Sequence, residues 1–96
     1  MTAYLIAQET VHDEAMFAQY RQAVLPTITA HGGKFTVRGG ELTVLEGEWP
    51  MPRLVIIEFP SRAAVEAWYR SPEYQKILPL RLNSTKGNLV IVEGIA

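Results

Sequence analysis

The pattern of apolar and polar positions predicts a strand and then a long helix in the first third of the chain. Residues 4–11 send successive side chains to opposite faces, as a β-strand does. Asp13 is the expected N-cap of the helix that follows, and Gly32-Gly33 is its expected end. Pro26 lies inside the helical pattern, so we expect a kink or a division there. The apolar face of this helix carries Met16, Phe17, Tyr20, Val24 and Ile28.

Strand patterns dominate the middle and the end of the chain. Residues 53–59 are rich in β-branched side chains and form the strongest strand pattern, while residues 34–38 and 89–93 form shorter ones. Gly39-Gly40 is typical of a two-residue hairpin turn. This turn predicts a short returning strand over residues 41–45, before a proline-rich loop.

Two helical segments are expected between the last two strands. Ser61 is the expected N-cap of the first segment. Ser71-Pro72-Glu73 begins the second, because serine caps a helix and proline suits its first position. Pro79 is expected to end this segment, and residues 83–88 then form a polar connection to the last strand.

The predicted elements follow the order β-α-β, a short hairpin, then β-α-β. Two such units in about 100 residues are typical of the split β-α-β arrangement. We therefore predict one α+β domain over residues 1–96, with a ferredoxin-like split β-α-β sheet and a short extra hairpin strand.

Both faces of this predicted sheet are apolar. Leu54 and Ile56 point to one side of their strand, while Val55 and Ile57 point to the other. Two helices cover only one face of such a sheet, and large exposed apolar patches are rare on monomers. We therefore expect a homodimer through the uncovered sheet face; the alternative is a monomer that exposes this face.

The order of several short motifs resembles a family of small bacterial proteins known as domain of unknown function 1330. The resemblance covers residues 3–94 and implies a dimeric α+β barrel, in which two ferredoxin-like sheets pack face to face. It implies no catalytic residues, since the family has none agreed. His12-Asp13-Glu14 departs from the Asp-Pro helix start common in the family. The motifs are Gly32-Gly33-Lys34-Phe35, Arg38-Gly39-Gly40, Leu45-Glu46-Gly47-Glu48-Trp49-Pro50, Glu58-Phe59-Pro60-Ser61, Ala67-Trp68-Tyr69 and Ser71-Pro72-Glu73-Tyr74-Gln75.

Composition and charge exclude several classes of protein. The net charge is −1, without the basic excess expected of a nucleic-acid-binding protein. The chain has no cysteine, which excludes thiolate catalysis, disulfides and cysteine-ligated zinc. Its apolar runs are too short to cross a membrane, and its start lacks the basic and apolar regions of a signal peptide. We therefore expect a cytoplasmic protein.

Glu58 and His31 are the candidate catalytic residues. Glu58 lies in the most hydrophobic strand, where a carboxylate acts as an acid or base if its pKa is raised. The alternative is a structural ion pair with Arg38 or Arg81. His31 could act as a general base, or it could simply stabilise the C-terminus of the first helix.

Arg38, Trp68 and Tyr74 are the candidate ligand-binding residues. An arginine before a turn can bind a carboxylate through two parallel hydrogen bonds, or it can lie solvated at the rim. Trp68 and Tyr74 could form the apolar wall of a cleft, or they could belong to the core.

Two functions remain open from the sequence. The first is binding of a small organic molecule, for example one with a carboxylate, in a cleft between helices and sheet. Such a protein could be a cofactor-independent isomerase or a monooxygenase-like enzyme. The second is a non-catalytic dimeric association module. No spacing of histidines and carboxylates matches a metal motif, so we expect no metal, haem or other cofactor.

Overall fold

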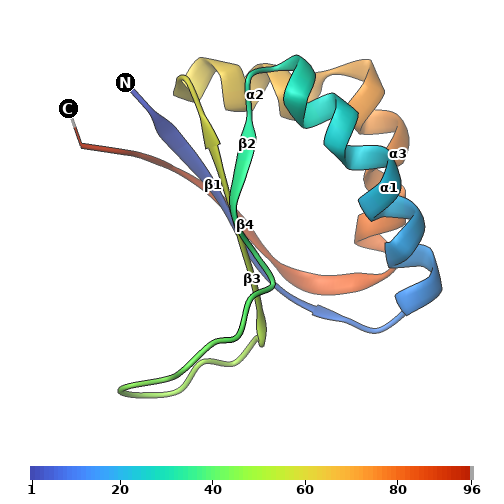
Figure 1. The fold of residues 1–96 in the computed structure, drawn as a ribbon. Helices are drawn as coiled ribbons and strands as arrows, with labels where there is room; N and C mark the ends of the chain where they lie inside the picture. The colour runs from blue at the N-terminus through green and yellow to red at the C-terminus, as the bar shows by residue number, and fades with distance from the viewer. Residues whose placement is uncertain (96) are drawn as a thin grey trace.

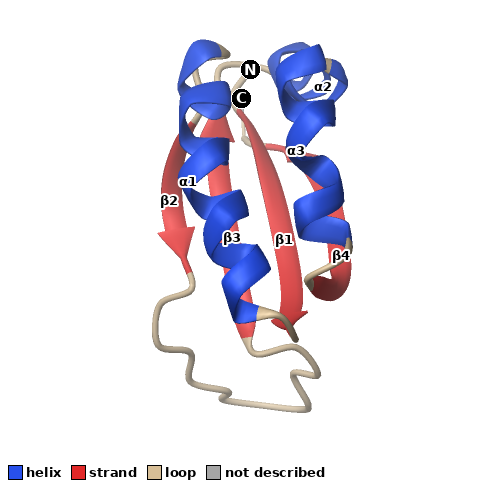
Figure 2. Cartoon of the chain, turned by 90° about the vertical axis from the view of Figure 1, so that its right-hand side faces the viewer, coloured by secondary structure: helices blue, strands red, loops and turns tan. Residues whose placement is uncertain are grey.

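The protein is a single antiparallel sheet with helices on one side (Figures 1 and 2). The computed structural model describes residues 1–95. Within this range it contains four strands and three helices. In chain order these are β1 (Ala3–Val11), α1 (Glu14–Ala30), β2 (Lys34–Arg38), β3 (Arg53–Phe59), α2 (Arg62–Arg70), α3 (Pro72–Leu82) and β4 (Thr85–Glu93).

The strand order across the sheet is β2-β3-β1-β4, and all neighbours are antiparallel. Each half of the chain is a β-α-β unit, and the first strand of each unit occupies the centre of the sheet. Figure 2 shows all three helices lying across the same face of this sheet. The predicted ferredoxin-like α+β fold is therefore confirmed.

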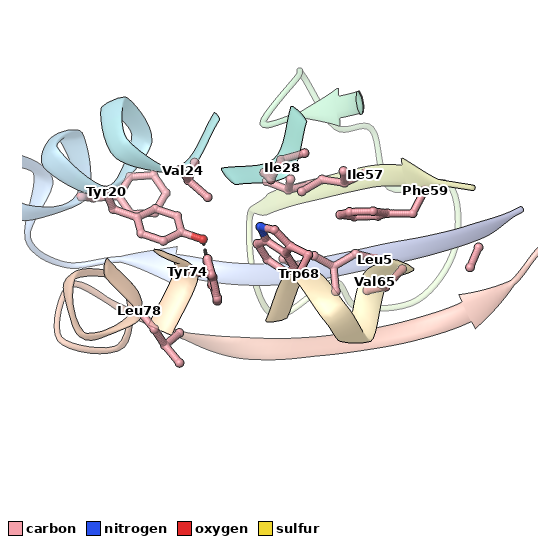
Figure 3. Close-up of a cluster of buried hydrophobic side chains, with 14 residues drawn as sticks. Leu5, Tyr20, Val24, Ile28, Ile57, Phe59, Val65, Trp68, Tyr74 and Leu78 are labelled. Carbon is pink, nitrogen blue, oxygen red and sulfur yellow. Dashed lines mark hydrogen bonds between the residues drawn. The ribbon is translucent and has the colours of Figure 1, made fainter. Parts of the chain in front are cut away.

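The helix-facing side of the sheet carries the core. Alternate residues of the two central strands are buried there, including Leu5, Ile57 and Phe59. Trp68 and Tyr74 pack over them from α2 and α3 and are also fully buried (Figure 3).

The opposite side of the sheet, which we call the open face, is apolar and is not covered by a helix (Figure 1). A row of four aliphatic side chains crosses it in register: Val37, Ile56, Ile6 and Val90. Val90 is 53% exposed, and Val92 further along the same strand is 45% exposed. The two-sided apolar pattern of the sequence is thus present in the sheet.

Helix α1 starts as expected but does not divide at its proline. The Asp13 carboxylate accepts a hydrogen bond from the backbone N–H of Met16 at 3.0 Å, which is standard N-capping geometry. The helix then runs on through Pro26 to Ala30. Buried Val24 and Ile28 anchor the turns on either side, while Pro26 itself is exposed. Packing against the sheet therefore outweighs the missing N–H.

Replacing Pro26 by alanine should stabilise the protein by about 1–3 kcal/mol. Proline costs about 3 kcal/mol more than alanine inside a helix, and its stiffening of the unfolded chain offsets about 1 kcal/mol. Urea denaturation followed by circular dichroism measures the change. Gln19→Ala, an exposed change in the same helix, is the matched control and should shift stability by no more than about 0.5 kcal/mol. Unchanged or lower stability of Pro26→Ala would contradict the prediction.

The strand predicted over residues 41–45 does not form. Residues 39–52 instead make an irregular loop, which we call the arm; in Figure 1 it extends from the lower end of the sheet, away from the helices. A two-residue hairpin of the expected type needs positive φ at both glycines, whereas only Gly39 has it, at 68°.

Two further boundaries differ from those expected. Helix α3 continues through Pro79 to Leu82, because buried Leu78 and Arg81 hold the helix on both sides of the exposed proline. Strand β4 begins at Thr85, four residues before the predicted start at residue 89, because it pairs with the far end of β1. The expected polar connection therefore shrinks to two residues, and its remainder is a strand.

Candidate functional site

A cavity of about 320 Å³ lies between α1 and the helix-facing side of the sheet. Its floor is formed by alternate residues of β1 and β3, and side chains of α1, α2 and α3 close it from above. One part is apolar and aromatic, and the other carries charged groups. The lining includes Leu5, Ala7, Val24, Ile28, Val55 and Ile57, and the polar residues described below.

The charged end of the cavity is built around Glu9, whose side chain is only 5% exposed. Arg53 lies directly opposite Glu9 on β3, and its Nε is 3.4 Å from Oε2. Arg81 reaches the same carboxylate from α3, with Nε 4.0 Å from Oε1. On the other side Glu9 faces Gly87 of β4, which offers no side chain. One carboxylate therefore lies between two guanidinium groups in a site largely shielded from water.

These ion pairs are loose. The 3.4 Å contact between Arg53 and Glu9 is not aligned as a hydrogen bond, and the buried Nε of Arg53 has no hydrogen-bond partner among the described residues. The guanidinium carbon of Arg53 also lies 5.1 Å from the centre of the Phe17 ring. Burial raises the pKa of Glu9, and the charges of Arg81 and Arg53 oppose this rise. The pKa of Glu9 is raised overall, so the effect of burial on this pKa is larger than the opposing effect of the two arginines.

A pair of tyrosine hydroxyls lies beside this cluster. The hydroxyl oxygens of Tyr20 on α1 and Tyr74 on α3 are 3.0 Å apart and hydrogen-bonded (Figure 3). Burial raises the pKa of both phenols, so both stay protonated and uncharged near neutral pH. The pair bridges the two helices and presents hydroxyl groups rather than charges to the cavity.

Trp68 forms the inner aromatic wall. It is 1% exposed, and its ring centroid lies 4.0 Å from that of Tyr74. Its indole N–H donates to the hydroxyl of Thr27 on α1 at 3.0 Å, and that hydroxyl donates to the carbonyl of Val24. This chain of hydrogen bonds fixes the tryptophan between α2 and α1.

Three of the five residues that the sequence nominated line the cavity: Arg38, Trp68 and Tyr74. Trp68 and Tyr74 also belong to the buried core, so the same side chains form both the core and the wall of the cavity. Arg38 is exposed at the end of β2, with its guanidinium carbon 4.7 Å from the centre of the Phe35 ring. It lies at the rim of the cavity.

Glu58 and His31 do not line this cavity. Glu58 points to the open face, because it has the opposite parity to the buried residues of β3. It lies 3.9 Å from Lys34, so neither Arg38 nor Arg81 is its partner. His31 caps the end of α1, where its Nδ1 lies 3.0 Å from the carbonyl oxygen of Thr27. The structure therefore does not bring these two residues together with the three cavity residues.

The sequence analysis did not nominate several polar residues of the cavity, among them Glu9, Arg53, Arg81 and Tyr20. The alternation within residues 4–11 puts Glu9 on the same side as Leu5 and Ala7, which is unusual for a carboxylate that ends in the core. The position of Glu9 on the apolar side of its strand could therefore have identified it as a cavity residue. The position of Arg81 could not be found in this way, because the sequence pattern ended its helix at Pro79.

Among residues 1–95, no group of three or more histidine, aspartate and glutamate side chains is placed to hold a metal ion. The described part of the chain also lacks a helix with the length and apolar character needed to cross a membrane.

Solved structures share this fold at low sequence identity. A protein of unknown function from Rhodopseudomonas palustris has a TM-score of 0.82 and 18% identity, covering 99% of this chain and 83% of its own. SnoaB, a cofactor-independent oxygenase from Streptomyces nogalater, has a TM-score of 0.69 and 12% identity, covering 99% and 94%. A dimeric ferredoxin-like protein of unknown function from Jannaschia sp. CCS1 has a TM-score of 0.69 and 15% identity, covering 98% and 100%. At these identities the likeness shows the fold alone.

Comparison of sequences places the chain in a family. No curated protein matches it. A family model matches residues 2–95, almost the entire chain. The ordered motifs and the fold agree with that match, and the chain therefore belongs to the family described as domain of unknown function 1330 (DUF1330).

Proposed function

We propose that this protein binds a small organic carboxylate in the cavity between α1 and the sheet. The observation that carries the proposal is the charge of the buried cluster: two arginines face one glutamate. The cluster thus has one positive charge in excess when Glu9 is ionised, and this excess favours an anionic ligand. Guanidinium groups suit carboxylates because they offer paired N–H donors in a plane.

The size and lining of the cavity restrict the ligand. Small-molecule sites range from about 300 to 1,000 Å³, so a cavity of about 320 Å³ lies at the small end. The walls beyond the arginines are aromatic and aliphatic, including Trp68, Val24 and Ile28. A ligand with one ring or a short branched chain, and one carboxylate, fits both the volume and the lining.

Proton transfer is the chemistry that such a site would supply. The buried carboxyl of Glu9, with its raised pKa, is suited to accept or donate a proton beside a bound ligand. SnoaB, which shares the fold, is described as a cofactor-independent oxygenase, and its reaction class is one candidate for the catalytic form of this proposal. An isomerase that moves a proton within its substrate is the other.

Arg81→Met should weaken benzoate binding by about 10- to 100-fold, since a hydrogen bond to a charged group contributes about 1.5–3 kcal/mol. Isothermal titration calorimetry measures this with the purified protein. The neutral isostere benzamide should bind the unmodified protein less tightly than benzoate. Arg70→Met, an exposed change at the end of α2, is the matched control and should leave binding unchanged. Equal affinity for benzoate and benzamide, or equal binding by Arg81→Met, would contradict the proposal.

We also propose that a second copy of the chain covers the open face. The row formed by Val37, Ile56, Ile6 and Val90 supports this, because an isolated protomer would leave it in water. The Jannaschia protein of the same fold is described as dimeric. This observation also supports the second candidate function, a non-catalytic association module. The two proposals are compatible, since the cavity and the open face lie on opposite sides of the sheet.

A further inference from the structure

We infer that the ligand carboxylate binds together with one proton, which Glu9 takes up as Arg53 and Arg81 turn to the ligand. The inference rests on the proposed carboxylate site and specifies how that site works. It makes Glu9 a built-in competitor for the arginines: a counter-ion when the cavity is empty, and a neutral carboxylic acid when the ligand is bound.

The geometry of the empty site favours such an exchange. The two arginines lie 3.4 and 4.0 Å from the carboxylate, and neither contact is a hydrogen bond in the described structure. The buried Nε of Arg53 thus still has a donor to offer. A ligand carboxylate that meets this donor gains a charge-assisted hydrogen bond without first breaking one.

Glu9 is the group in the cavity that can take up a proton when a ligand anion binds. Gly87 offers no side chain on the β4 side. The titratable and charged side chains that line the cavity with Glu9 are Tyr20 and Arg21 from α1, Arg38 from β2, Arg53 from β3, and Tyr74 and Arg81 from α3. The two tyrosines are uncharged, and among residues 1–95 no further acid lines this cavity.

Two carboxylates beside the same pair of arginines repel each other strongly in a space shielded from water. Burial already raises the pKa of Glu9, and a neighbouring anion acts in the same direction. Once protonated, Glu9 can donate its O–H to the ligand carboxylate. The bound state then has one shared proton between two carboxyl groups, as in paired carboxylates elsewhere.

Calorimetry in different buffers tests this directly. Benzoate and acetate are titrated into the unmodified protein at one pH, in two buffers with different enthalpies of ionisation. Acetate is included because it is small enough to enter the cavity even if benzoate is too large. The dependence of the measured enthalpy on the buffer gives the number of protons taken up, which we expect to approach one for each ligand bound. The affinity should correspondingly fall by up to about tenfold for each unit of rising pH.

Glu9→Gln should still bind both carboxylates, but without proton uptake and without this pH dependence. Glu58→Gln, which removes a carboxylate from the open face, is the matched control and should take up protons as the unmodified chain does. If Glu9→Gln does not fold, NMR of the ¹³C-labelled carboxyl of Glu9 in the unmodified protein replaces it, and its pKa should rise on adding benzoate.

Four results would contradict these proposals. Binding without proton uptake would overturn the inference and leave the carboxylate site standing. Proton uptake that persists in Glu9→Gln, or an unmoved pKa of Glu9, would also overturn it. Failure of both benzoate and acetate to bind the unmodified protein would overturn the proposed function, and this inference with it.

Discussion

Replacing Ile56 by glutamate should separate two protomers or leave the chain unfolded. Ile56 lies on the central strand β3, in the row where it has Val37 on one side and Ile6 on the other. If a second copy covers this row, the new carboxylate is buried without a partner, which costs several kcal/mol. Such a cost weakens the dimer by about 100-fold or more.

Light scattering coupled to size-exclusion chromatography measures this effect. At micromolar concentration the unmodified protein should have twice the chain mass of 10.8 kDa, and Ile56→Glu should have the chain mass or elute as unfolded protein. Ala63→Glu, an exposed position on α2, is the matched control and should stay dimeric. A mass of 10.8 kDa for the unmodified chain would refute the dimer.

Replacing Trp68 by alanine should lower the free energy of unfolding by about 3–5 kcal/mol. Trp68 packs against Phe59 and Tyr74, with ring centroids 5.8 and 4.0 Å away. Its removal deletes the largest fully buried side chain and the hydrogen bond to Thr27. The helices cannot close the gap easily, because the tyrosine pair already fixes α1 to α3.

Urea denaturation at a fixed protein concentration measures the loss. Trp68→Phe, which keeps an aromatic ring, should lose less than half as much stability as Trp68→Ala. A loss below about 1 kcal/mol for Trp68→Ala would show that the surrounding helices collapse into the space after all.

The elements that the sequence predicts well are those with local signals. Ser61 and Ser71 cap the expected helices, and β3 has the predicted bounds of residues 53–59. Pro26 and Pro79 misled the prediction, because their effects depend on distant contacts. The glycine pair misled it because Gly40 does not have the positive φ of the expected turn. Buried residues on either side keep α1 helical through Pro26 and α3 helical through Pro79. This effect cannot be predicted from the residues next to each proline.

The candidate site was predictable only in part for a related physical reason. The polar tips of the aromatic residues near the second helix led to the nomination of Trp68 and Tyr74, and both line the cavity. Glu58 was nominated as an acid or base because it lies in the most hydrophobic strand, whereas its parity in β3 turns it to the open face, away from the cavity. Glu9, Arg53 and Arg81 come from three elements, and only the strand register and the path of α3 bring them together.

The two tryptophans of this chain occupy opposite environments, and this makes the protein its own fluorescent reporter. Trp68 is buried in the cavity wall, whereas Trp49 is 44% exposed in the arm. With Trp49→Phe, the emission of Trp68 alone follows events in the cavity. With Trp68→Phe, the emission of Trp49 follows the arm and whatever approaches it. Two single substitutions thus separate the signal of the cavity from the signal of the arm without any added dye.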